Sequence, residues 1–200
     1  MEKLLICGDS FAADWTIKYE GKGWPNLLSD YFEITNLAQA GCSEYKIYKQ
    51  LTSVDLTKYD RIILSHTSPY RIPIETHPVH YKDKLHKNSD LIYNDIKEHS
   101  KKNNKLISIV EFFENYFDVE YAIFTHTLLC EKIDTVLRHV SDKVLHVTNI
   151  DWTDLYEFQP MLNFEFLFDS NRGLLNHYNQ EGNNIVFKTI LNQWGISSVG

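Results

Sequence analysis

Polar residues follow three of the predicted strands, at the points where those strands end. The clusters are Gly8-Asp9-Ser10, residues 40–43 and residues 65–68. In parallel α/β sheets the carboxyl ends of the strands meet at one edge, where backbone amides of such loops point into a shared crevice that binds ligands. A serine between a strand and a helix also feels the positive end of that helix, which stabilises nearby negative charge. Ser10 is therefore a candidate nucleophile.

The elements that must position Ser10 alternate along the first third of the chain. Short apolar runs predict strands at residues 3–7, 33–38 and 61–65, with helical signals between them at 24–31 and 43–51. Strands and helices that alternate at this spacing form βαβ units with right-handed crossovers. This part of the chain therefore predicts a parallel sheet.

The rest of the chain is mostly helical. Residues 69–87 predict a loop, and further elements are expected as helices at 89–100, 106–117, 121–139 and 181–194 and a strand at 143–150. The sequence shows no internal repeat and no linker, so residues 1–200 are expected to form a single domain. The predicted fold is α/β with three layers (α/β/α) and a mostly parallel sheet of four or five strands. Residues 75–139 are expected to form a helical insertion or lid.

Composition excludes several classes of protein. The chain is 43% hydrophobic with a net charge of −7, which argues against nucleic acid as a partner because phosphate binding needs clustered Lys and Arg. Three widely spaced cysteines predict neither a disulfide framework nor a zinc site. No segment approaches the roughly 20 apolar residues of a membrane span, and the first apolar run is too short for a secretion signal. We expect a cytoplasmic protein.

The polar clusters, together with a histidine before the last helix, resemble the SGNH (GDSL-type) hydrolase family. In that family a Gly-Asp-Ser block follows the first strand, a glycine the second, an Asn-containing block the third, and a histidine precedes the last helix. Those places are held here by Ser10, Gly41, Thr67 or Ser68, and His177. The resemblance spans residues 4–194, includes Gly23-Trp24-Pro25, and implies a flavodoxin-like hydrolase fold.

The resemblance implies a serine ester hydrolase that needs no cofactor. Its substrate would be an O-acylated small molecule or glycan, from which it removes an acyl group such as acetyl. His177 would take the proton of Ser10, which attacks the ester carbonyl. The backbone amides of Ser10 and Gly41, with the hydroxyl of Thr67, would bind the oxyanion.

Two positions depart from the family's pattern. The third block usually reads Gly-x-Asn-Asp, whereas residues 65–68 read Ser-His-Thr-Ser. The fourth usually reads Asp-x-x-His, but Leu174 stands three residues before His177. The carboxylate that orients the imidazole would then come from Asp169, Asp151 or Asp154, or a backbone carbonyl would replace it. The expected chemistry is a Ser-His pair with an unplaced third member.

Other functions use the same residues. An acyltransferase would use the same Ser-His pair, and a catalytically silent binding protein would keep only the fold. In that second case Ser10 would cap the first helix, His177 would be a surface histidine at a helix start, and Gly41 and Thr67 would be turn residues. The oligomeric state is left open.

The middle of the chain carries three further features. His77 and His80, with His66 and His86 nearby, could suggest a metal site, but Pro78 prevents helical one-face geometry, and no metal is expected. Arg71, four residues after Thr67, is a candidate for contact with an anionic or sugar substrate. The aromatic residues at 112–124 show helical spacing and predict core packing, with a lid or dimer face as the alternative.

Overall fold

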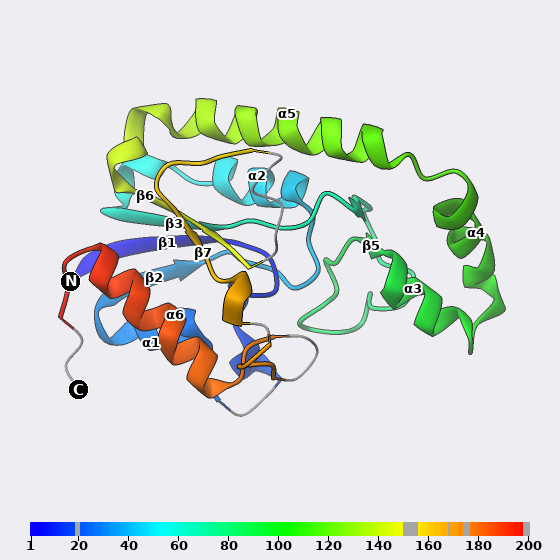
Figure 1. Cartoon of the computed structure of the whole chain (residues 1–200), viewed down its shortest axis with the longest axis horizontal. Coiled ribbons are helices and arrows are strands. Elements are labelled where there is room, and N and C mark those ends of the chain that lie inside the picture. The colour runs from blue at the N-terminus through cyan, green and yellow to red at the C-terminus, as the bar shows by residue number, and fades with distance from the viewer. Residues whose placement is uncertain (19–20, 150–155, 168, 174–176, 198–200) are drawn as a thin grey trace.

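Five parallel strands form the centre of the molecule, which we describe from a computed structural model (Figure 1). The structure describes residues 1–18, 21–149, 156–167, 169–173 and 177–197. The strands are β1 Glu2–Gly8, β2 Phe32–Asn36, β3 Arg61–Ser65, β6 Val144–Thr148 and β7 Met161–Asn163. Every neighbouring pair in this sheet is parallel. The predicted three-layer α/β fold with a parallel sheet is confirmed.

The order of the strands creates a crevice. In the order β2-β1-β3-β6-β7 the chain passes from β1 outward to β2 and then returns to β3 on the opposite side of β1. In open parallel sheets ligands bind at such a reversal, outside the carboxyl ends of the strands. Gly8, the last residue of β1, pairs with Ser65, the last residue of β3. The first and third polar clusters therefore stand side by side.

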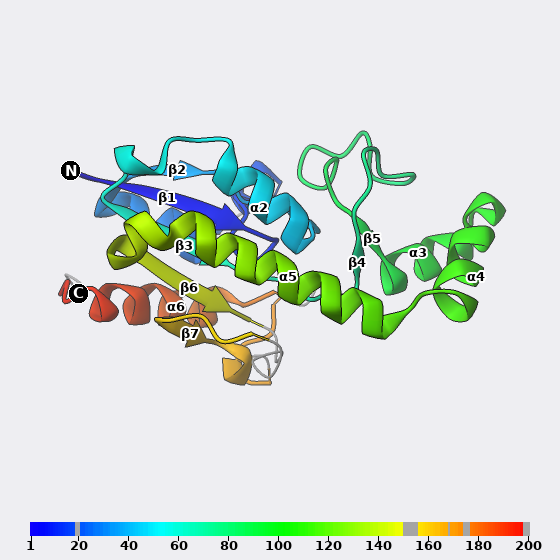
Figure 2. The same cartoon turned by 90° about the horizontal axis from the view of Figure 1, so that it is seen from above.

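Helices cover both faces of the sheet (Figures 1 and 2). One face is covered by α1 Trp24–Leu27 and α6 Gln180–Gln193, the other by α2 Glu44–Thr52 and α5 Val119–Leu137. Successive residues of a strand point to opposite faces, so Leu4 and Ile6 enter the first core while Leu5 and Cys7 enter the second. This two-sided burial is why the strands read as continuous apolar runs.

A helical arm extends beyond the carboxyl ends of the strands (Figure 2). It consists of α3 Tyr93–Ser100, α4 Ile107–Asn115 and the first half of α5. None of the α4 residues is fully buried, whereas the second half of α5 packs Cys130, Ile133 and Leu137 into the core. The segment 75–139, expected to be an insertion, is therefore divided between the arm and one core layer.

A small antiparallel pair connects the arm to the sheet. Strands β4 Arg71–Ile72 and β5 Leu91–Ile92 pair with each other and close the loop between them. The helix expected from residue 89 is wrong at its start, because Leu91 and Ile92 are held in this pair and α3 begins only at Tyr93. The short strand β7 was also missed.

Short 3-10 helices complete the chain. They are η1 Trp15–Ile17, η2 Leu28–Asp30, η3 Leu56–Lys58, η4 Asn104–Leu106, η5 Arg138–Lys143 and η6 Glu165–Leu167. Among the described residues, no helix combines the length and the hydrophobicity that crossing a bilayer requires.

Candidate functional site

The end of β1 is fixed by a close approach to β3. A side chain at Gly8 would place its Cβ 2.7 Å from the Cβ of Ser65, so only glycine fits there. The Gln50 amide then holds both backbone groups of Gly8: its Oε1 accepts from the Gly8 N–H at 2.8 Å, and its Nε2 donates to the Gly8 carbonyl at 3.2 Å. This rigid strand end sets the position of Ser10 two residues later.

A tight turn carries Ser10. The Asp9 carboxylate accepts from the Phe11 N–H at 3.0 Å, and the Trp15 indole N–H donates to the Ser10 carbonyl at 2.6 Å. The first helical turn after Ser10 is η1, whose N-cap is Asp14, and the helix expected from residue 24 begins there as α1. Ser10 therefore caps no helix, and the predicted helix-dipole stabilisation of charge at this serine is lost.

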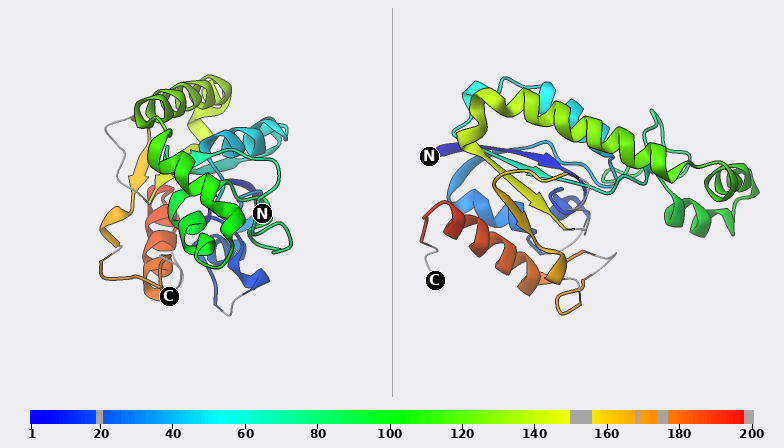
Figure 3. Two further views of the ribbon diagram at one scale, coloured as in Figure 1. Left: turned by 90° about the vertical axis from the view of Figure 1, so that its right-hand side faces the viewer. Right: turned by 45° about the horizontal axis from the view of Figure 1, so that its top comes forward.

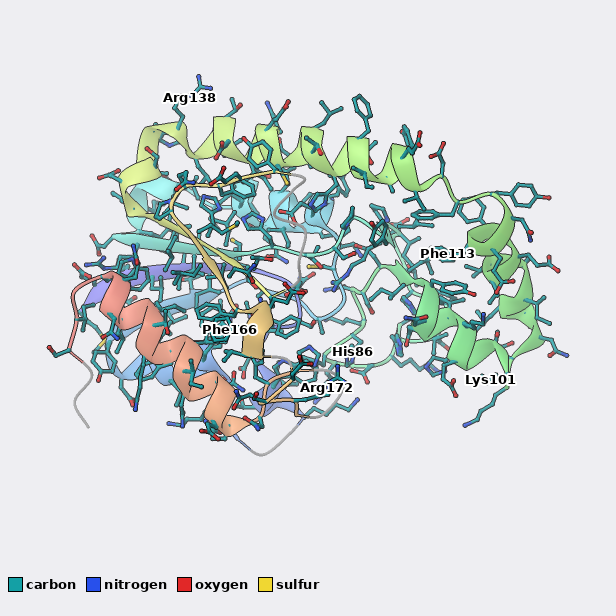
Figure 4. All side chains as sticks on the ribbon, viewed as in Figure 1. His86, Lys101, Phe113, Arg138, Phe166 and Arg172 are labelled. Carbon is teal, nitrogen blue, oxygen red and sulfur yellow. The ribbon has the colours of Figure 1, made fainter. Side chains whose placement is uncertain are left out.

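Ser10, Gly41, Arg71 and His177 line one cleft. Its volume is about 950 Å³, and its further lining includes His80, Asp83, His86, Asp95, His99 and Arg172. His86 and Arg172 are labelled in Figure 4, near the end of the sheet where this cleft lies. The structure thus brings three of the four expected blocks, and Arg71, to a single opening.

His177 packs against the loop that carries Ser10. The centroid of its ring lies 4.9 Å from that of Phe11 and 4.3 Å from that of Trp15. It precedes α6, whose N-cap Asn179 accepts from the Gly182 N–H at 2.9 Å. These contacts place the imidazole beside the turn of residues 9–15.

The carboxylate that would orient His177 is not identified. Asp169 is exposed and makes no hydrogen bond or ion pair with any other described residue. Asp151, Asp154 and Leu174 lie outside the described residues. The expected third member of a triad therefore stays a prediction.

Gly41 has a conformation that other residues rarely adopt. Its φ is +74°, and a Cβ there would lie 2.5 Å from the Cβ of Ser89. The backbone N–H groups of Gly41 and Ser10 meet no acceptor in the described part of the chain, whereas Gly41 accepts from Asp90 through its carbonyl at 3.0 Å. Both amides are thus available to a ligand in the cleft.

Thr67 lies beneath the cleft rather than in its wall. Its side chain is fully buried, its hydroxyl donates to Asp9 Oδ2 at 3.2 Å, and its N–H donates to Glu44 Oε2 at 3.2 Å. Both of its donors are engaged in supporting contacts. The expectation that Thr67 is the third oxyanion donor does not fit this geometry.

Arg71 links the floor of the cleft to its opening. Its guanidinium donates to the Cys42 carbonyl at 2.6 Å and to Asp9 Oδ2 at 3.2 Å, and its side chain is only 10% exposed. Asp9 is fully buried; burial raises the pKa of its carboxyl, and the Arg71 charge opposes that rise. Arg71 is therefore both a wall of the cleft and the partner of a buried acid.

Histidines gather around Asp95 on the far side of the cleft. His80 Nε2 lies 3.0 Å from Asp95 Oδ2, and the Nε2 atoms of His77 and His99 each lie 3.7 Å from an Asp95 oxygen. Ligand atoms of His77, His80 and Asp95 all lie within 4.8 Å of one another. Sequence reasoning missed Asp95 and His99, although their spacing of four residues on a helix was a usable signal.

The protonation of His77 decides how this cluster behaves. Its Nδ1 accepts from the backbone N–H groups of Val79 and His80, at 3.2 and 3.1 Å. Burial lowers the pKa of His77 to about 4, so at neutral pH the ring carries one proton, on Nε2. A metal-binding histidine instead donates from its other ring nitrogen and leaves the ligating one unprotonated. In this geometry His77 is a donor that faces Asp95.

A second histidine in the cleft has its own carboxylate. His86 Nδ1 lies 3.3 Å from Asp83 Oδ1, which also accepts from the His86 backbone N–H at 3.1 Å. Burial lowers the pKa of His86, and the hydrogen bond to Asp83 opposes this.

Comparisons with known proteins identify no family for this chain. No model of a known protein family matches the chain, and no curated protein matches it.

Proposed function

We propose that the protein is a serine ester hydrolase in which Ser10 is the nucleophile and His177 the general base. One observation carries the proposal: Ser10 and His177, from opposite ends of the chain, line one cleft beside two backbone amides that no described residue accepts from. A nucleophile, a base and oxyanion donors are the parts that acyl transfer requires.

The reaction runs in two steps. His177 accepts the Ser10 proton while Ser10 Oγ attacks the ester carbonyl carbon, and the tetrahedral intermediate collapses as His177 protonates the leaving alcohol. Water, deprotonated by His177, then attacks the acyl-serine and releases the carboxylic acid. Each bond formed at the carbonyl carbon replaces one that breaks. The Ser10 proton leaves with the alcohol, and the proton that His177 takes from water passes to Ser10 Oγ, which restores the enzyme.

The oxyanion is bound by the amides of Ser10 and Gly41. The Asp9 turn fixes the first amide and the left-handed conformation of Gly41 the second, so neither reorganises during the reaction. Arg71 takes the place expected for Thr67, because its guanidinium has five N–H donors and the structure shows two contacts for it inside the protein. A single preorganised donor contributes roughly 3–4 kcal/mol to the transition state.

The first experiment measures hydrolysis of short-chain p-nitrophenyl esters. Ser10→Ala and His177→Ala are expected to lower kcat by about 10³-fold or more, because neither half of such a pair works alone. Ser141→Ala and His139→Ala are the matched controls. Both residues are exposed and neither lines the cleft, so these variants are expected to keep wild-type rates.

A fluorophosphonate probe tests the nucleophile independently of the substrate. It should label the wild type at Ser10, as located by mass spectrometry, and should not label Ser10→Ala. Activity that survives in both Ser10→Ala and His177→Ala would refute the assignment. If His86→Ala loses esterase activity while His177→Ala keeps it, the general base is His86, paired with Asp83, rather than His177.

The rival functions give different results in the same assays. If an added alcohol captures the acyl group faster than water does, the protein is an acyltransferase with the same residues. If the wild type neither hydrolyses any ester nor reacts with the probe, it is a silent binding protein that retains the fold.

A further inference from the structure

A second hollow adjoins the cleft that contains Ser10. It has a volume of about 640 Å³ and lies between the β4–β5 pair and the helical arm. Arg71, Ile92 and Asn94 line both spaces, so the two adjoin at these residues. Figure 3 shows the arm at the end of the sheet where the strands finish, which is the end that carries Ser10.

The wall of this hollow is mostly apolar. Its apolar and aromatic lining comprises Tyr70, Ile92, Tyr93, Phe113, Phe117 and Val119. The Phe113 ring, labelled in Figure 4, lies 5.7 Å from that of Tyr93 and 5.3 Å from that of Phe117, measured between centroids. These rings form one continuous apolar surface contributed by α3, α4 and the residues that follow α4.

Several polar groups at the same wall are engaged with one another. The Tyr93 hydroxyl donates to Glu114 Oε1 at 2.5 Å, and Lys97 Nζ lies 3.0 Å from the same oxygen. Ser68 Oγ accepts from the Tyr70 N–H at 3.3 Å. The charged group at the junction with the cleft is Arg71. A ligand that fits both spaces therefore has a polar end near Arg71 and an apolar end in the hollow.

We propose that this hollow, which we call the acyl pocket, holds the hydrocarbon chain of the ester that Ser10 attacks. This inference rests on the proposed function. The carbonyl would lie in the cleft near Arg71, with the chain passing Ile92 and Asn94 towards Phe113. The volume falls within the usual range of small-molecule sites, about 300–1,000 Å³. The substrate class is then an ester of a medium-chain carboxylic acid rather than an acetyl ester.

The test compares p-nitrophenyl acetate, butyrate, hexanoate and octanoate. For the wild type, kcat/KM is expected to rise by up to about fourfold per added methylene, the value expected for complete burial. Val119 lines the pocket and is half exposed, so a tryptophan at this position would fill part of the pocket. In Val119→Trp, kcat/KM should therefore rise less with each added methylene. Phe113→Ala, which removes one wall without adding bulk, is a second variant should the first fail to fold.

Phe124→Ala is the matched control. Phe124 is an exposed aromatic residue of the same arm, 59% accessible, and it does not line the acyl pocket. This variant should keep the wild-type dependence on chain length. A dependence that Val119→Trp and Phe113→Ala leave unchanged, or that Phe124→Ala abolishes equally, would overturn the inference.

A binding measurement separates this inference from the proposed function. In the Ser10→Ala protein, calorimetry should show octanoate binding about tenfold or more tightly than acetate, with the preference lost on adding Val119→Trp. No preference would refute the acyl pocket whatever the enzyme hydrolyses. An active enzyme with no chain-length dependence refutes the pocket alone, whereas a wild type inactive on every ester refutes the proposed function and this use of the pocket with it.

Discussion

The helical arm extends beyond the carboxyl ends of the strands (Figure 2), the end of the sheet where Ser10 and its cleft lie, yet the two regions are built in opposite ways. Beneath the cleft, Asp9, Thr67 and Arg71 are buried or nearly so and hydrogen-bonded to one another. In the arm, apolar side chains stay in contact with solvent: Phe112 is 44% exposed and Tyr116 76% exposed.

The difference shows how one domain can combine fixed chemistry with adaptable binding. A catalytic constellation must be held closely by its supporting contacts, and the paired groups beneath Ser10 supply that support. A region with few buried apolar contacts opens locally at low cost, which suits a wall that closes on a flexible chain. We therefore expect changes beneath the cleft to be costly and changes on the arm to be mild.

The largest effect is expected at Arg71. Arg71→Ala leaves the Asp9 carboxylate buried without its charged partner, which should lower the free energy of unfolding by about 3–5 kcal/mol. Urea denaturation followed by circular dichroism measures this. Arg138→Ala, at the exposed end of α5 (Figure 4), is the control and should change stability by less than about 0.5 kcal/mol. A loss below about 1 kcal/mol for Arg71→Ala would show that the floor of the cleft is not as tightly coupled as its contacts suggest.

Two substitutions on α5 compare core and arm within one helix. Ile133 is fully buried against the sheet, whereas Leu128, about one turn earlier, is 46% exposed. Ile133→Ala should cost about 2–5 kcal/mol through lost burial and the cavity left behind, and Leu128→Ala less than about 1 kcal/mol. Thermal and urea unfolding report both values. Equal losses would mean that the arm is covered by something in solution.

The histidine cluster should make stability depend on pH. The pKa of His77 falls from its ordinary value of 6.5 to about 4 because the ring is buried, so between these values the unfolded chain binds more protons than the folded one. The stabilisation is complete above pH 6.5 and is lost as the pH falls to 4, by up to about 3 kcal/mol. The neighbouring His80 and His99 lower the pKa of His77 further, and the carboxylates of Asp90 and Asp95 oppose the fall. His77→Gln should flatten this slope in urea titrations at a series of pH values, and an unchanged slope would assign it to other groups.

The smallest effect is expected on the exposed surface of the arm. Phe124→Ala should change the free energy of unfolding by less than about 0.5 kcal/mol, since the ring is already 59% exposed.

Hydrogen exchange compares the two regions without a mutation. The backbone amides of α4 should exchange faster than those of β1 and β3, which lie in the centre of the sheet. Slow exchange throughout α4 would contradict the contrast between the two regions.

Strands buried on both faces were the most predictable elements. The apolar runs at 3–7 and 61–65 became β1 Glu2–Gly8 and β3 Arg61–Ser65, because parallel strands covered by helices on both sides need continuous apolar residues. Strand β7 was missed because its three residues show no pattern of their own and are held by pairing with β6.

The aromatic middle shows where periodicity misleads. Helical spacing of Phe112, Tyr116, Tyr121 and Phe124 predicted core packing, but all four are exposed, so that expectation is wrong for them. Periodicity describes a face of a helix and carries no information about whether a neighbour covers it. Only the position of α4 beyond the end of the sheet decides this.

The sequence by itself determined the local parts of the site. It placed Ser10 after a buried strand and a glycine at position 41, because strand burial and left-handed backbone leave strong signatures in residue type. Only the tertiary structure decided that His177 joins Ser10 in one cleft, that Arg71 pairs with Asp9, and that Thr67 faces inward. Those contacts join residues from distant segments, and their existence depends on strand order and helix packing rather than on any local pattern.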